Sequence, residues 1–287
     1  MAQRPSSRFF RVQVRRGGGV LPGFSLSAGF AIAYLGLIVL VPLGALLLRA
    51  AEMSWAEFFA AVTGPRALAA YKLSFGASFI AAVLNLLFGP IVAWVLVRYS
   101  FPGKGVLDAM VDLPFALPTA VAGIALTAVF SAHGWLGSLL ATYGVRVVYT
   151  PVGVIVALTF VGLPFVVRTV QPVILGLDPQ VEEAAAVLGA SRLRTFVSVV
   201  FPNLLPALLT GFALAFARAV GEYGSVIFIA GNLPFRTEIV PLLIVIKLEQ
   251  YDYAGATALA VVMLAASFVF LLTLNGLQAW SRKRTGK

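Results

Sequence analysis

The sequence predicts an all-α polytopic membrane protein with six transmembrane helices, and three observations lead to that prediction. Of the 287 residues, 60% are hydrophobic and 11% are charged, whereas soluble domains contain about 45–50% apolar and about 25% charged residues. The mean hydropathy is +0.97. Six long stretches contain no Lys, Arg, Asp or Glu. These observations exclude a soluble enzyme, a disordered chain and a nucleic-acid-binding module, so we expect no nucleic-acid partner.

Each stretch is long enough to cross a bilayer, because a hydrocarbon core of about 30 Å requires about 20 apolar residues. Strands of a transmembrane barrel are about ten residues long and alternate in polarity, unlike these continuous runs. Charged sequence rather than a small-residue cleavage site follows the first stretch, so we expect it to be retained. The predicted spans are residues 26–48, 73–97, 113–132, 147–167, 197–217 (continuing past Arg218) and 254–280.

The distribution of positive charge predicts the orientation. Most of the 21 Lys and Arg residues fall in segments that lie inside if the N-terminus is cytoplasmic. Since cytoplasmic loops carry an excess of these residues, we expect both termini in the cytoplasm. The predicted organisation is a basic cytoplasmic N-terminal segment (1–25), a six-span transmembrane domain (26–280) and a basic cytoplasmic tail (281–287). The formal net charge of +10 is then largely a signal of topology.

Several kinds of chemistry are missing from the sequence. It contains no cysteine and one histidine, which argues against thiolate and histidine-rich metal sites, so we expect no metal. No segment matches G-x-x-x-x-G-K-[ST], the loop that cradles nucleotide phosphates. The spans carry neither a paired nucleophile and base nor a chain of acidic residues for proton relay. We therefore expect no enzyme and no cofactor in this chain, and any nucleotide-driven step requires a separate ATPase.

A polar segment at residues 172–201, between the fourth and fifth predicted spans, should form two short cytoplasmic helices. Asp178 followed by Pro179 is typical of a helix start, and acidic residues in the next turn suit the helix dipole. Gly189 suits the C-terminal turn, and Ser191 can cap a second helix. The small, alanine-rich face between them suits docking in a groove of a partner. An amphipathic connector without a partner is the alternative that local physics allows.

The spacing within this segment resembles the EAA motif of ABC importer permeases, E-A-A-x3-G-x9-I-x-L-P. Residues 183–202 match it at every fixed position except for Val in place of Ile and Phe in place of Leu. In that family the motif forms the coupling helices, which sit in a cleft of the ATP-binding subunit. The resemblance thus implies a type I ABC importer permease fold with a cytoplasmic coupling loop (residues 172–201). It assigns contact with the ATPase to Glu182, Glu183, Ala184, Ala185 and Gly189.

Further segments resemble the sulfate/thiosulfate permeases of this family, and among them the T-type subunit. They are residues 112–126, 164–172, 221–232 and 251–253, with weaker likeness between about 70 and 280. The resemblance implies a multi-pass protein of the bacterial inner membrane that imports sulfate or thiosulfate. It also implies four partners: a W-type permease, an ABC ATPase dimer that binds ATP and Mg²⁺, a periplasmic sulfate-binding protein and membrane lipid.

The candidate substrate path centres on Arg218 and Glu222, which lie four residues apart and so share a helix face. One reading is structural, with Glu222 neutralising an arginine that is costly to bury. The other is that Arg218 offers a dianion a transient forked donor while Glu222 prevents overly tight binding. The two readings are compatible. Thr119 could add a neutral donor, although such residues more often bond neighbouring helices.

Two other functions remain open at this stage. A permease of the same fold could carry another oxyanion, molybdate or tungstate, because tetrahedral dianions differ little in charge. A proton-coupled secondary anion transporter would need an isolated titratable group at the middle of the membrane. The sequence offers only the Arg218 and Glu222 pair for that role.

Overall fold

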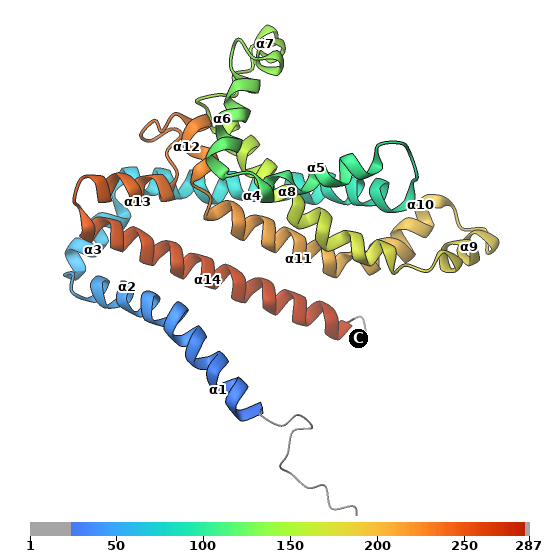
Figure 1. The fold of residues 1–287 in the computed structure, drawn as a ribbon, viewed down its shortest axis with the longest axis horizontal. Coiled ribbons are helices and arrows are strands. Elements are labelled where there is room, and N and C mark those ends of the chain that lie inside the picture. The colour runs from blue at the N-terminus through green and yellow to red at the C-terminus, as the bar shows by residue number, and fades with distance from the viewer. Residues whose placement is uncertain (1–23, 285–287) are drawn as a thin grey trace, which may run out of the picture. The chain divides into compact units, whose positions relative to one another are not determined.

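The computed structural model describes residues 24–284, and over that range the regular elements are all helices (Figure 1). The chain divides into two compact units, one that ends at Leu48 and one that begins at Arg49. In the first unit, α1 (Phe24–Leu35), a π-helical turn η1 (Gly36–Leu40) and the start of α2 (Val41–Ala51) form one apolar helix. The side chains exposed on this helix are mostly apolar, which is typical of a segment that faces lipid or another protein.

The second unit is built on α4 (Pro65–Arg98), α8 (Pro151–Leu175) and α11 (Phe201–Val220), which pack against one another. Without a hydrophobic force between helices in lipid, such packing relies on small residues that allow close approach. A Cβ added at Gly89 would lie 2.8 Å from Val166 Cγ1, and one at Gly211 would lie 3.0 Å from the Val166 Cα. Glycine on α4 and α11 therefore lets both helices approach the same turn of α8.

Shorter helices and the C-terminal helix surround this core. Helix α14 (Tyr253–Arg284) packs against α3 (Trp55–Thr63), α11 and α13 (Val240–Glu249). The rings of Phe216 on α11 and Phe270 on α14 lie 4.0 Å apart between centroids. Ser54 and Glu57 form a capping box at the start of α3, in which each satisfies a backbone N–H of the other.

The third predicted span, residues 113–132, is broken rather than a single helix. The structure has two helices there, α5 (Lys104–Ala116) and α6 (Thr119–Phe130), bent by 117° at the break. Pro118 lacks a backbone N–H, and the residue before a proline is driven out of the helical region. Leu117 accordingly has an extended backbone (φ −81°, ψ 135°). Helix α6 instead packs on α12 (Gly224–Ala230) and leads into α7 (Trp135–Thr142).

The other five predicted spans are confirmed as helices long and apolar enough to cross a membrane. They are Leu26–Ala51, Pro65–Arg98, Pro151–Leu175, Arg192–Val220 and Tyr253–Leu274. The fifth continues past Arg218 to Val220, as expected. The predicted N-terminal segment lies almost entirely outside the described residues, as do the last three residues of the predicted tail.

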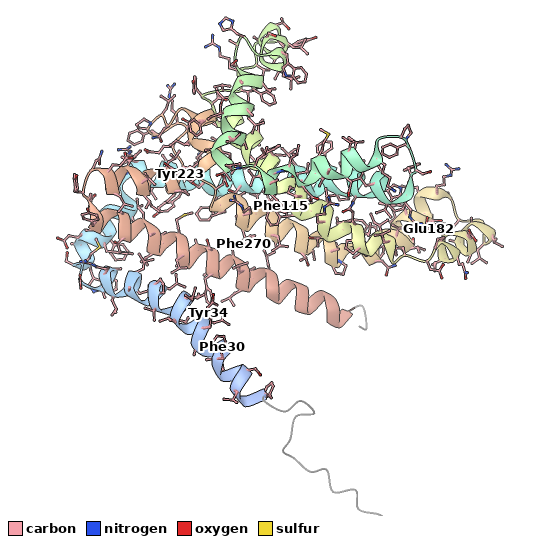
Figure 2. All side chains as sticks on the ribbon, viewed as in Figure 1. Phe30, Tyr34, Phe115, Glu182, Tyr223 and Phe270 are labelled. Carbon is pink, nitrogen blue, oxygen red and sulfur yellow. The ribbon has the colours of Figure 1, made fainter. Side chains whose placement is uncertain are left out.

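The segment between α8 and α11 forms one end of the second unit. It contains α9 (Pro179–Val187), α10 (Arg192–Thr195) and a second π-helical turn, η2 (Phe196–Val200). Figure 1 shows α9 and α10 at the opposite end of this unit from α3 and α13. Glu182 on α9 and Tyr223, just before α12, correspondingly lie far apart along the bundle (Figure 2). The two groups of candidate site residues therefore occupy different parts of the second unit.

Candidate functional site

The coupling loop has the local structure that its sequence predicts. The Asp178 carboxylate accepts a hydrogen bond at 2.9 Å from a backbone N–H in the first turn of α9, and Pro179 is the first residue of that helix. Gly189 follows α9 with φ at +81°, a conformation in which glycine avoids the penalty of a Cβ. Ser191 then caps α10. The predicted helix, turn and second helix are confirmed.

The residues assigned to ATPase contact divide into an outer and an inner set. Glu183 and Ala184 are exposed, and Ala185 is half-buried. Glu182 points back into the bundle, where its carboxylate pairs with the Arg98 guanidinium at the end of α4. Glu182 thus ties α9 to the bundle, and the surface available to a partner is that of Glu183 and the alanines.

Three apolar side chains are strongly exposed beside these residues. Val187 and Leu188 at the end of α9 are each 87% exposed, and Leu193 on α10 is 74% exposed. Exposed apolar groups clustered on a polar segment are typical of a protein-binding surface. We call Val187, Leu188 and Leu193 the loop-tip patch.

The second candidate group begins with an ion pair at the end of α11. Arg218 Nη1 lies 2.5 Å from Glu222 Oε2, with the arginine side chain 35% exposed and that of the glutamate 1% exposed. Glu222 Oε1 also accepts hydrogen bonds from the backbone N–H of Ser225 at 2.8 Å and from its hydroxyl at 2.9 Å. The expected pair is therefore formed, and the buried carboxylate has partners on both oxygens, as a buried charge requires.

Thr119 lies close to this ion pair, because the break between α5 and α6 meets the break between α11 and α12. It is the first residue of α6, directly after the bend, and α12 starts at Gly224 after the break that follows α11. A Cβ at Gly224 would lie 2.1 Å from Thr119 Oγ1, and one at Gly123 would lie 2.4 Å from the Ser225 carbonyl oxygen. The structure thus brings Thr119 close to the segment that holds Glu222. We call Thr119, Arg218, Glu222 and Ser225 the charged junction.

Sequence analysis missed a partly exposed network of charged side chains, centred on Arg168 of α8. Its guanidinium donates to Asp112 Oδ1 at 2.7 Å and Oδ2 at 2.5 Å, and to Asp108 Oδ1 at 2.6 Å, while Gln171 accepts a further bond at 2.6 Å. The spans were identified by the absence of charge, so Arg168 and Asp112 were placed just outside them. The spacing of Asp108 and Asp112 was a usable signal, since residues four apart on a helix present both carboxylates on one face.

A further ion pair joins α4 to the segment that precedes α13. Arg66 Nε and Nη2 donate to the two oxygens of Glu238 at 2.8 and 2.6 Å. This forked geometry is among the strongest that side chains make, and Glu238 is only 1% exposed. Nothing in the sequence pairs residues so far apart in the chain, so this contact became visible only in the structure.

The fold agrees with comparisons to known proteins. Residues 85–287 match the family model of the binding-protein-dependent transport system inner membrane component. The chain belongs to that family. A solved bacterial ABC transporter involved in the import of the acidic polysaccharide alginate shares the fold. Its TM-score is 0.72 at 16% identity, covering 90% of this chain and 96% of that one.

Curated relatives of this permease are more similar in sequence. A sulfate transport system permease protein CysT from Salmonella typhimurium is 51% identical over 260 residues, which cover 91% of this chain and 94% of the relative. One from Escherichia coli is 50% identical over 270 residues, covering 94% and 96%. The family and the type I ABC importer permease fold implied by the EAA motif are confirmed.

Proposed function

We propose that this chain is the membrane-spanning subunit through which an ABC importer moves sulfate or thiosulfate across the bacterial inner membrane. The observation that carries this proposal is the identity of about one half to sulfate transport permeases over more than nine-tenths of the chain. The break at residues 117–118 and the charged junction lie within the matched length. A common fold alone would not distinguish one substrate from another.

The energy comes, in this proposal, from a separate ABC ATPase dimer that binds ATP and Mg²⁺. Three features support the coupling loop as the contact: Glu183 and Ala184 are exposed, the loop-tip patch is apolar, and the helix start is capped. The ATPase moves this loop, and the bundle switches between openings to either side of the membrane. The chain itself breaks no bond.

The anion passes close to the charged junction. Arg218 is the only partly exposed cation there, and its forked guanidinium suits a tetrahedral dianion. Glu222 balances its charge, which favours release, because a conducting site must bind weakly enough to let the ion leave. The Thr119 hydroxyl supplies a neutral donor beside the break between α5 and α6.

The remaining partners follow from the same proposal. A W-type permease completes the translocation path, a periplasmic sulfate-binding protein delivers the anion to the outer face, and both termini lie in the cytoplasm. Specificity between sulfate and molybdate resides largely in the binding protein, because both anions are tetrahedral and carry the same charge, which gives the permease little to distinguish.

Uptake of labelled sulfate into proteoliposomes tests the proposal. The vesicles hold this chain, its W-type partner and the ATPase, with the binding protein outside and ATP inside. We expect uptake that requires ATP, persists when the proton gradient is collapsed, and is reduced by unlabelled sulfate or thiosulfate more than by molybdate or tungstate. Uptake that needs a proton gradient but no ATP would indicate a secondary transporter, and stronger competition by molybdate would reassign the substrate.

A further inference from the structure

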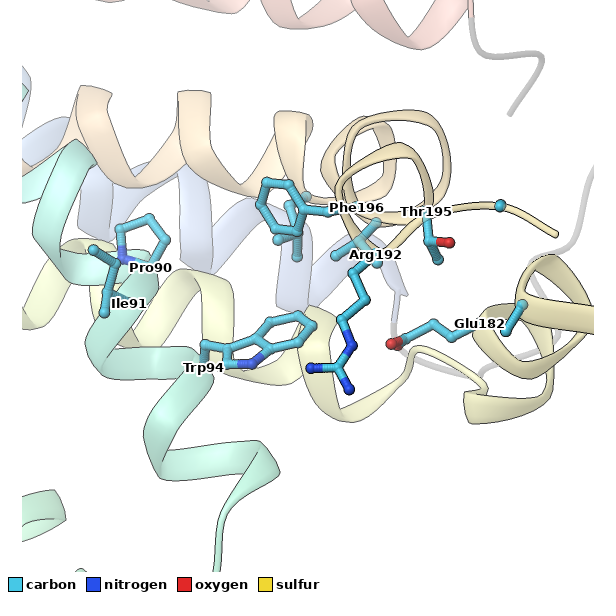
Figure 3. Close-up of a pocket in the computed structure, with 11 residues that line it drawn as sticks. Pro90, Ile91, Trp94, Glu182, Arg192, Thr195 and Phe196 are labelled. Atoms are coloured by element: carbon cyan, nitrogen blue, oxygen red, sulfur yellow. The ribbon is translucent and has the colours of Figure 1, made fainter.

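A groove of about 540 Å³ separates the last turns of α4 from the segment that joins α9 to α11 (Figure 3). Its inner wall is apolar and includes Pro90, Ile91 and Leu204, while Glu182 and Arg192 lie at its polar end. From Pro90 to the end of α4 at Arg98 the helix rises about 12 Å, at about 1.5 Å per residue. The groove therefore runs from a charged end toward the apolar middle of the bundle.

Aromatic side chains line the groove just inside its charged end. The rings of Trp94 and Phe196 lie 6.4 Å apart in an edge-to-face arrangement, and the Arg98 guanidinium lies 5.1 Å from the centroid of the Trp94 ring. Tryptophan is enriched where hydrocarbon meets lipid headgroups. Trp94 lies one turn before the end of α4 at Arg98, so a position at the membrane interface on the α9 side suits this residue.

The charges at the groove's polar end do not cancel. Glu182 is already paired with Arg98, and the Nε of Arg98 is buried without a hydrogen-bond partner among the described residues. Arg192 makes no ion pair within the described part of the chain. Figure 3 shows its side chain reaching from α10 toward Trp94 and Glu182 at the groove's edge. One uncompensated positive charge remains above an apolar, aromatic-lined groove.

We propose that this groove binds an anionic phospholipid of the leaflet on the α9 side. The phosphate lies at Arg192, and an acyl chain runs along Trp94 and Phe196 toward Leu204. A positive end and an apolar wall at interfacial depth match a molecule with a negative headgroup and a hydrocarbon tail. Because the groove is walled by α4 on one side and by the coupling loop on the other, the bound lipid braces the loop against the bundle. This binding site does not depend on which anion is transported.

Retention of lipid by the purified importer complex tests the site without any substrate. The complex is delipidated in detergent, incubated with phosphatidylglycerol or phosphatidylethanolamine, and the lipids that remain bound are counted by native mass spectrometry. We expect Arg192→Gln to lower phosphatidylglycerol retention about fivefold, the effect of removing one basic residue near an anionic headgroup. Retention of phosphatidylethanolamine should change much less.

Two further variants separate the groove from general surface charge. Arg194→Gln is the matched control, because Arg194 is exposed on the same short helix but does not line the groove; its retention should equal that of the unmodified complex. Ala190→Phe fills the groove without changing charge and should lower retention as much as Arg192→Gln. Equal losses in the two arginine variants, or full retention in Ala190→Phe, would overturn the proposal.

A photo-crosslinking residue at position 91 identifies the occupant directly, since Ile91 lines the groove and is exposed. Crosslinks to phospholipid are expected. Crosslinks to the partner permease or the ATPase in place of lipid would assign the groove to a protein contact and contradict the proposal. Because neither assay measures uptake, a failure here is distinct from a failure of sulfate transport.

Discussion

Replacing Arg218 by alanine should destabilise the permease by leaving the Glu222 carboxylate buried without its counterion. Breaking a buried ion pair from one side costs about 3–5 kcal/mol, chiefly through the charge that remains. Arg218 is 35% exposed, so water partly replaces it, and we expect about 3 kcal/mol, the lower end of that range. The two hydrogen bonds from Ser225 keep the carboxylate in place but do not neutralise it.

Glu222→Gln provides the matched comparison. A glutamine carbonyl can still accept from Ser225, and the partly exposed Arg218 is then solvated, so this variant should lose about 1 kcal/mol. The double variant should lose little more than that, because it removes both charges together. We therefore expect a coupling free energy of about 3 kcal/mol between the two positions, at the upper end of the range for contacting residues.

Equilibrium unfolding in mixed micelles with increasing SDS measures these four stabilities, and sulfate uptake is measured on the same preparations. A double variant as unstable as Arg218→Ala would refute the argument that the unpaired charge is the cause. Recovery of both stability and uptake in the double variant would leave Arg218 with a structural role alone. Recovery of stability without recovery of uptake is the result expected if Arg218 also contacts the anion.

Four further outcomes are expected. Glu183→Lys should abolish uptake and uncouple ATP hydrolysis while the protein still inserts, because it reverses an exposed charge on the coupling surface. Gly189→Val should reduce coupling strongly and Gly189→Asn only slightly, because asparagine tolerates the positive φ at that turn. Arg66→Ala should cost about 3 kcal/mol by stranding the buried Glu238. Finally, the pKa of Asp252 is lowered by its lysine partner and by a backbone N–H. The ion pair contributes about 0.5 kcal/mol to folding stability at this exposed position, and this contribution should be present at neutral pH. It should be lost as the pH falls below about 4, through the lowered pKa of Asp252.

Each of these outcomes has its own control. Membrane amounts of Glu183→Lys, measured by quantitative blotting, separate lost coupling from lost insertion, and normal uptake would count against the coupling assignment. Equal coupling in the two Gly189 variants would show that backbone conformation does not matter there. Adding Glu238→Gln to the Arg66→Ala variant should restore stability, because no unpaired charge then remains buried. Asp252→Asn should remove the acid-dependent loss, and an unchanged pH profile in that variant would contradict the assignment.

Local sequence was sufficient for the parts of the structure that depend on near neighbours. The start of α9 at Asp178 and Pro179, its end at Gly189 and the cap at Ser191 all follow from side chains that bond their own backbone within a few residues. Five spans were likewise predictable because a long apolar run has few alternatives to a membrane helix. The extension past Arg218 was predictable for the same reason.

Features that depend on distant contacts were not predictable. Pro118 was visible and accounts for the extended backbone of Leu117, but many membrane helices tolerate proline, and the packing of α6 on α12 that goes with this break is a distant contact. The partners of Arg168 lie 56 and 60 residues away, and no local spacing encodes that separation. The pairing of Arg218 with Glu222 was predictable from their spacing of four residues, although α11 ends at Val220 and Glu222 lies just beyond it. Its burial was not, since burial depends on α6 and α12.

The length of α4 has a consequence for how motion could pass through the molecule. The helix is continuous for 34 residues, about 51 Å at about 1.5 Å per residue, and it is fastened near each end by an ion pair. Glu182 holds one end to α9, and Glu238 holds the other to the segment before α13. A rotation of about 5° around its midpoint moves the two ends by about 2 Å in opposite directions, given that length. A small sideways shift of the loop would thus be converted into a shift of similar size, and opposite direction, on the far side of the membrane.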